Sequence, residues 1–245
     1  MNAFTYSYPV KVYFGEKAAE KHLKNELAKV GANVLLAYGG GSIRKNGAFD
    51  SLSHSMETYM GSPRQVNLSD EIHEATQSNI IRNIRATIAN PDDMQARSEL
   101  IWAAAMAENG ILKIGKVTDF QCHMLEHQLG AYTDCNHGQG LAVLHPVLYR
   151  HMLPEAAPQF ARLAVEVWGI DPAGKNEQAL ANAFVDALAA FIKEIGLPTT
   201  FAEMKIPVDT DYKAIAESTI LTGGCAKKFT ADELYNVLLE CRAPQ

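Results

Sequence analysis

The spacing of apolar residues changes near residue 50 of this chain. Before that point, the stretch YSYPVKVYFG alternates polar and apolar side chains, which is the two-residue period of a β-strand. The stretch EKAAEKHLKNELAKVG has helical spacing and ends at Gly31, a residue type that commonly follows helices. NVLLAY is a short, nearly all-apolar run of the kind found in buried parallel strands. This first part therefore predicts a strand–helix–strand unit of α/β type.

From Asp50 onward the apolar positions follow helical spacing, and no stretch has the character of a strand. We therefore expect a mostly α protein, with an all-helical domain over 50–245 preceded by a short α/β stub over 1–49. Prolines should separate the helices, because proline lacks the amide hydrogen that a helix interior needs; Pro154 is expected to be one such break. The predicted helices lie in 69–90 and 91–112, and near 118–130, 139–152, 154–168, 176–195, 211–222 and 230–242.

Composition narrows the classes of function. The chain has 245 residues, 47% of them hydrophobic, with 22 basic against 28 acidic side chains and no basic run, which argues against binding to nucleic acid. We expect no signal peptide and no membrane span, because no apolar run is long enough, and therefore a cytoplasmic protein. Four cysteines without CxxC spacing are expected to be reduced thiols: Cys122, Cys135, Cys225 and Cys241.

Three histidines gather in HMLEHQLGAYTDCNHGQG, residues 123–140. His123 and His127 are four residues apart, so they share one face of a helix, and His137 follows in a loop. Two histidines at this spacing are often simply part of the polar face of a helix and bind no metal. A third histidine from another segment favours a metal site, because metal ligands commonly come from more than one stretch of backbone.

A second pair of potential ligands lies at Asp50 and His54, again four residues apart. Together with His123 and His137 it forms a set of one carboxylate and three imidazoles. That set suits Fe²⁺ or Zn²⁺ better than Mg²⁺ or Ca²⁺, which prefer oxygen ligands. Taken alone, Asp50 also fits the N-cap of a helix, and Cys135 is a less favoured alternative ligand.

The blocks DSLSHSMETYMG and DFQCHMLEHQLGAYTDCNHGQGLAVLHP, together with the N-terminal block, resemble the iron-containing (group III) alcohol dehydrogenases. The similarity is greatest to the NADPH-dependent butanol dehydrogenase and aldehyde reductase type. The resemblance implies that His127 lies near the nicotinamide and the substrate and is not a ligand, although spacing favours pairing it with His123. It implies the metal ligands Asp50, His54, His123 and His137.

The resemblance also implies a nucleotide site. The GGGS stretch, formed by Gly39, Gly40, Gly41 and Ser42, corresponds to the family's turn near the adenosine ribose. The turn lacks an acidic side chain that would repel a 2′-phosphate, which favours NADP(H) over NAD(H). A second family motif, with Asp three residues after the Ser, would hold the pyrophosphate; this chain has Lys45 at that place.

Most of the nucleotide-binding domain is therefore expected to be missing through an internal deletion near Asp50, whether natural, engineered or from a gene-model error. The implied activity is hydride transfer between NAD(P)(H) and a primary alcohol or aldehyde, and the missing segment is expected to impair it. A homodimer is a candidate assembly.

His127 is either a proton relay or a hydrogen-bonding group behind the ligands. Two alternatives are a metal-binding helical protein without redox activity, and a metal-dependent hydrolase with Glu57 or Glu126 as its base.

Overall fold

The computed structural model describes residues 17–29, 45–64 and 66–242. Over these residues the protein is helical, and its only β-type pairing there is an isolated bridge between Ser62 and Val117. The expectation of a mostly α protein is confirmed. Both predicted strands and the GGGS stretch at 39–42 lie outside the described residues. The helices are α1 (Ala18–Leu27), α2 (Asn46–Tyr59), α3 (Leu68–Ala89), α4 (Met94–Glu108), the 3₁₀ turn η2 (Ile111–Lys113), α5 (Gln121–Thr133), α6 (His137–Glu166), α7 (Glu177–Glu194), α8 (Tyr212–Ser218) and α9 (Ala231–Glu240).

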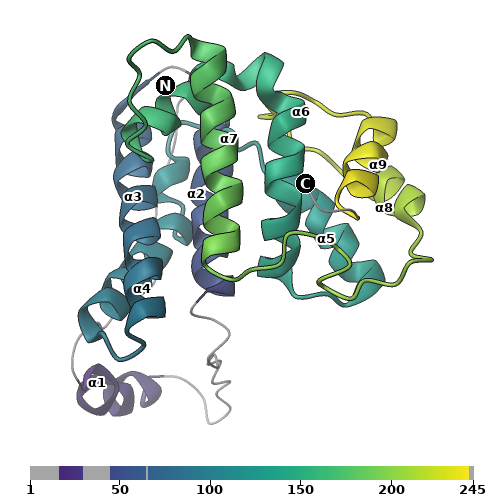
Figure 1. Ribbon diagram of the computed structural model, residues 1–245. Helices are drawn as coiled ribbons and strands as arrows, with labels where there is room; N and C mark the ends of the chain where they lie inside the picture. Colours follow the sequence, from purple (N-terminus) through teal and green to yellow (C-terminus); the bar gives the residue numbers. More distant parts are fainter. Residues whose placement is uncertain (1–16, 30–44, 65, 243–245) are drawn as a thin grey trace.

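Helix α2 is the central element of the body. It packs against α3 and α4 on one side and against α6 on the other, while α7 lies along α6 (Figure 1). Phe49, Leu52 and Met56 of α2 are at most 1% exposed. Each such side chain contributes roughly 1.5–3 kcal/mol through removal of apolar surface from water. The polar residues that α2 carries between them are thereby held in fixed positions.

Side-chain caps fix the starts of several helices. Asn67 and Asp70 form a capping box at α3, and Thr230 and Glu233 form another at α9. Asn136 accepts a hydrogen bond from the Gln139 amide and begins α6. Such caps satisfy amide groups that have no partner within the helix. The cap at Asn136 makes His137 the first residue of α6.

The predicted break at Pro154 is wrong, because α6 is one helix that contains Pro146, Pro154 and Pro158. A proline within a helix costs about 3 kcal/mol through a lost hydrogen bond and a clash with the preceding turn. Pro154 and Pro158 are four residues apart on the exposed face, where water reaches the freed carbonyl groups. The opposite face, with Phe160 and Leu163, is fully buried, and this packing outweighs the cost.

Asp50 is not an N-cap, because α2 begins four residues earlier and its N-cap is Lys45. The proposed boundary between 49 and 50 therefore falls inside a helix. Among the described helices none is long and apolar enough to cross a membrane. All four cysteines are free, as expected.

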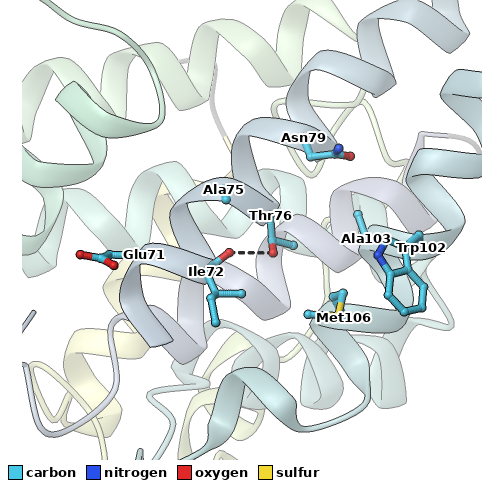
Figure 2. A pocket seen from close by; sticks show the side chains of 8 residues that line it. All are labelled: Glu71, Ile72, Ala75, Thr76, Asn79, Trp102, Ala103 and Met106. Atoms are coloured by element: carbon cyan, nitrogen blue, oxygen red, sulfur yellow. Dashed lines mark hydrogen bonds between the residues drawn. The ribbon is translucent and has the colours of Figure 1, made fainter. Parts of the chain in front are cut away.

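A groove of about 360 Å³ lies between α3 and α4 (Figure 2). Thr76 on its floor hydrogen-bonds within its own helix, to the carbonyl of Ile72. Trp102 at its edge is 51% exposed, and Met94 and Ile101 on the same helix are 66% and 60% exposed. The groove contains none of the predicted metal ligands.

Candidate metal centre

Three helix segments bring the predicted ligands together. Asp50 and His54 lie one turn apart in α2, His123 lies in the first turn of α5, and His137 opens α6. Oδ1 of Asp50 is 3.4 Å from Nε2 of His123 and 3.5 Å from Nε2 of both His54 and His137. These four residues are called the Asp50 cluster below.

The separations from Asp50 fit an ion between the side chains of Asp50, His123 and His137, whose ligand atoms lie within 4.8 Å of one another. His54 is grouped with Asp50 and Glu108 on the other side of the same carboxylate. With bonds of 2.0–2.1 Å to a tetrahedral ion, neighbouring ligand atoms are about 3.4 Å apart. A direct N–H···O hydrogen bond is usually shorter, at about 2.7–3.2 Å. Oδ1 of Asp50 and Nε2 of His123 are both buried and have no hydrogen-bond partner. Because unpartnered buried polar atoms are costly, the donor set fits a divalent cation.

Two buried glutamates orient the imidazoles. Glu57 accepts a hydrogen bond from Nδ1 of His123, and Glu126 accepts one from Nδ1 of His137. Both carboxylates are at most 2% exposed. A proton held on Nδ1 leaves Nε2 free to ligate, and a carboxylate behind a histidine is a common feature of metal sites.

Sequence reasoning missed these orienting roles and considered the two glutamates as bases. A signal was available, because Glu57 follows His54 by three residues and Glu126 follows His123 by three. Each glutamate therefore shares a helix face with a ligand. Glu57 also accepts a hydrogen bond of 2.6 Å from the amide of Cys122 at the start of α5, where the helix dipole favours negative charge.

Protons occupy part of the cluster when no ion is bound. Burial lowers the pKa of His123, but the neighbouring carboxylates of Glu57 and Asp50 outweigh it and raise the pKa to about 9. The neighbouring carboxylates of Asp50 and Glu126 raise the pKa of His137 to about 10. For His54, burial and the nearby His123 lower the pKa to about 4. An incoming cation must therefore displace protons from His123 and His137.

The cluster opens toward solvent on one side. The His123 side chain is 1% exposed, whereas His54, Asp50 and His137 are 18%, 28% and 37% exposed. Nε2 of His54 lies 3.3 Å from Oε2 of Glu108, at the end of α4. A small molecule can thus reach the open side while His123 anchors the buried side.

His127 stands beside the cluster. Its ring stacks on that of His137 with a centroid distance of 5.3 Å and is 6.0 Å from the ring of His123. Burial and the charges of His137 and His123 lower its pKa, so the exposed imidazole is neutral and able to accept a proton.

The chain belongs to the iron-containing alcohol dehydrogenase family. Residues 45–240 match the C-terminal domain of the Fe-containing alcohol dehydrogenases, as the motif resemblance indicated. The chain is 34% identical over 179 residues to NADH-dependent butanol dehydrogenase B of Clostridium acetobutylicum. This match covers 73% of this chain and 46% of that protein. It is 27% identical to the NADPH-dependent aldehyde reductase YqhD of Escherichia coli over 158 residues, covering 64% of this chain and 40% of YqhD.

Solved structures show the same fold. NADH-dependent butanol dehydrogenase A from Thermotoga maritima superimposes with a TM-score of 0.73 at 27% identity, over 81% of this chain and 52% of that one. Substrate- and cofactor-free YqhD superimposes with a TM-score of 0.75 at 23% identity, over 83% of this chain and 54% of YqhD. The chain thus spans about half the length of the proteins it matches.

Proposed function

We propose that this chain is a metal-dependent, NAD(P)-linked alcohol dehydrogenase or aldehyde reductase, which transfers hydride between the nicotinamide and a primary alcohol or aldehyde. The observation that carries the proposal is the carboxylate oxygen of Asp50 among the Nε2 atoms of three histidines, two of them oriented by buried glutamates. Family membership supports the same chemistry.

The proposed ligands of Fe²⁺ or Zn²⁺ are the four residues of the Asp50 cluster. When bound, the ion supplies Lewis acidity that polarises the oxygen of an alcohol or aldehyde. Glu57 and Glu126 keep two imidazoles in the orientation and tautomer that ligation needs. His127 accepts the hydroxyl proton of the alcohol or returns it to the reduced aldehyde, because its neutral ring stands exposed beside His137.

The nucleotide part of the proposal rests on residues before α2. We propose that NADP(H) is preferred, because the GGGS stretch at 39–42 has no acidic side chain to repel a 2′-phosphate. The names of the relatives include both NADH- and NADPH-dependent enzymes. We further propose that turnover is low, because the pyrophosphate motif of the family is missing from the sequence and hydride transfer needs a positioned cofactor.

The runner-up is a metal-binding helical protein without redox activity, which the missing pyrophosphate motif favours. Hydrolysis has less support, because its candidate bases Glu57 and Glu126 are buried and engaged with His123 and His137. The proposed homodimer is to be checked by the mass in solution, and the proposed cytoplasmic location by fractionation of cells.

The test uses the purified full chain loaded with Fe²⁺ or Zn²⁺. We expect about one ion per chain by elemental analysis, loss of that ion in His123→Ala, and no loss in His151→Ala, whose histidine pairs with Glu240 away from the cluster. Slow butanal reduction with NADPH supports the dehydrogenase. Metal binding without NADPH binding, followed by fluorescence, supports the runner-up. Absence of metal from the wild-type chain contradicts both.

A further inference from the structure

A hydrogen bond joins the starts of the two helices that carry Asp50 and His137. Asn46 is the first residue of α2 and is 8% exposed. Its Nδ2 donates to Oδ1 of Asn136 over 3.1 Å. Asn136 is the N-cap of α6, and His137 follows it directly. Neither asparagine is among the proposed metal ligands, but each is close in sequence to one of them.

The backbone settles the direction of this bond. Oδ1 of Asn136 also accepts a hydrogen bond of 3.2 Å from the amide of Gln139, so the atom at that place must be an oxygen. Asn46 must then present its amino group, because its own oxygen would face another oxygen. This orientation leaves Oδ1 of Asn46 buried and without a hydrogen-bond partner among the described residues. Since such groups are costly and rare, the bond to Asn136 is kept at the expense of that oxygen.

The bonded pair fixes α6 close to the carboxylate of Asp50. Asn46 and Asp50 are four residues apart, so they lie on the same face of α2. Gly138 lies against the backbone of Asn46, where an added Cβ would come 2.4 Å from the carbonyl oxygen. The first turn of α6 is thereby anchored one helical turn from Asp50, whose Oδ1 lies 3.5 Å from Nε2 of His137.

We propose that Asn46 is a positioning residue, which acts through Asn136 to set the separation of Asp50 and His137 and thus the affinity for the ion. The inference rests on the proposed metal binding by the Asp50 cluster. Glu126 orients the ring of His137 through Nδ1, whereas the asparagine pair holds the backbone from which that ring projects. Both are needed, because a binding site must hold its groups within about 0.5 Å of the productive geometry.

The test uses the full chain after removal of metal by a chelator. Asn46→Ala removes the donor. Asn136→Ser keeps a good N-cap but is too short to reach Asn46, and Asn136→Asp keeps an oxygen for both bonds. Asn176→Ser is the matched control, because Asn176 caps α7 through the amide of Ala179.

Three measurements are made on each variant. Zn²⁺ affinity is measured by competition with a coloured chelator, and the visible absorption of bound Co²⁺ reports the coordination geometry. Urea unfolding of the metal-free chain separates a change at the site from a change in stability.

We expect Asn46→Ala and Asn136→Ser each to bind Zn²⁺ at least about tenfold more weakly and to alter the Co²⁺ spectrum. Asn136→Asp should keep at least the wild-type affinity, and Asn176→Ser should leave affinity and spectrum unchanged. The double variant Asn46→Ala/Asn136→Ser should bind no more weakly than either single variant, because both changes remove the same bond.

Wild-type affinity and spectrum in Asn136→Ser, while His123→Ala loses the ion, would overturn the proposal even if Asn46→Ala does not fold. Losses that add in the double variant would also overturn it, since the two asparagines would then act separately. If the wild-type chain binds neither Zn²⁺ nor Co²⁺, the proposed metal site itself fails, and the positioning role fails with it.

Discussion

Glu57 on α2 is hydrogen-bonded to Nδ1 of His123 on α5, and both side chains are 1% exposed. The pair joins two helices that are far apart in sequence at the buried end of the metal centre. Burial opposes ionisation of Glu57, but the imidazole of His123 and the amide of Cys122 outweigh it and lower the carboxyl pKa. The interaction therefore fixes an ionised carboxylate behind a ligand.

The first prediction concerns this pair. Glu57→Gln keeps the size of the side chain but removes its charge, so it should orient His123 less firmly and weaken Zn²⁺ binding about 10–100-fold. Isothermal titration calorimetry measures the affinity, with Glu155→Gln on the exposed face of α6 as control. Wild-type affinity in folded Glu57→Gln would show that the glutamate does not support the ligand.

Sequence patterns were sufficient for the helical body, because it depends on the regular spacing of apolar residues, whereas the choice of His137 rather than His127 as a predicted ligand came from the resemblance to the family. The features that the sequence did not predict depend on contacts between segments that are far apart along the chain. The continuity of α6 through Pro154 comes from packing of its buried face, which overrides local propensity. The approach of Glu108 to His54 joins residues 54 positions apart, and no periodicity within one helix can indicate it.

The second prediction concerns pH and stability. Burial and the nearby charge of Lys116 lower the pKa of His73 to about 3, and its ring bonds Ser55 and the carbonyl of Leu112. Since the folded pKa lies below the unfolded value of 6.5, protons favour the unfolded chain. This contribution to stability is complete above pH 6.5 and falls as the pH drops toward 3, by up to about 1.4 kcal/mol per pH unit.

Urea unfolding of metal-free protein at pH 7, 6, 5 and 4 measures this effect. His73→Gln should be less stable than wild type at pH 7, because it loses the fitted hydrogen bonds, and should lose stability less steeply on acidification. His151→Ala, which changes a half-exposed histidine, should keep the wild-type slope. If the free energies of unfolding of wild type and His73→Gln decrease equally as the pH falls, the pH dependence does not come from His73.

The third prediction concerns removal of metal. An ion that binds only the folded chain stabilises it by about 2.7 kcal/mol when its concentration is 100 times the Kd. For a chain of this size that corresponds to a rise of about 5–10 °C in Tm. Thermal unfolding with Zn²⁺ and with a chelator should show this difference in the wild type and lose it in His123→Ala. A chelator-insensitive Tm in metal-loaded wild type would contradict the coupling of the ion to the fold.

The last prediction tests the contact that sets α6 against α2. Gly138 lies in the first turn of α6, and a Cβ there would come 2.4 Å from the backbone oxygen of Asn46. Because backbone cannot move aside as a flexible side chain can, Gly138→Ala should destabilise the fold by roughly 1–3 kcal/mol and displace the neighbouring His137 from the cluster. Both the free energy of unfolding measured in urea and the affinity for Zn²⁺ should therefore decrease.

Gly130 provides the matched control, since it is also within a helix but a Cβ there would have its nearest neighbour at 3.7 Å, an ordinary contact with Glu126. Gly130→Ala should leave Zn²⁺ affinity unchanged and stabilise the fold by up to about 1 kcal/mol, because alanine favours the helix. If the two variants behave alike, the close approach at Asn46 is not what positions His137. If Gly138→Ala alone loses both stability and metal, the start of α6 is held against α2 by a contact that only glycine permits.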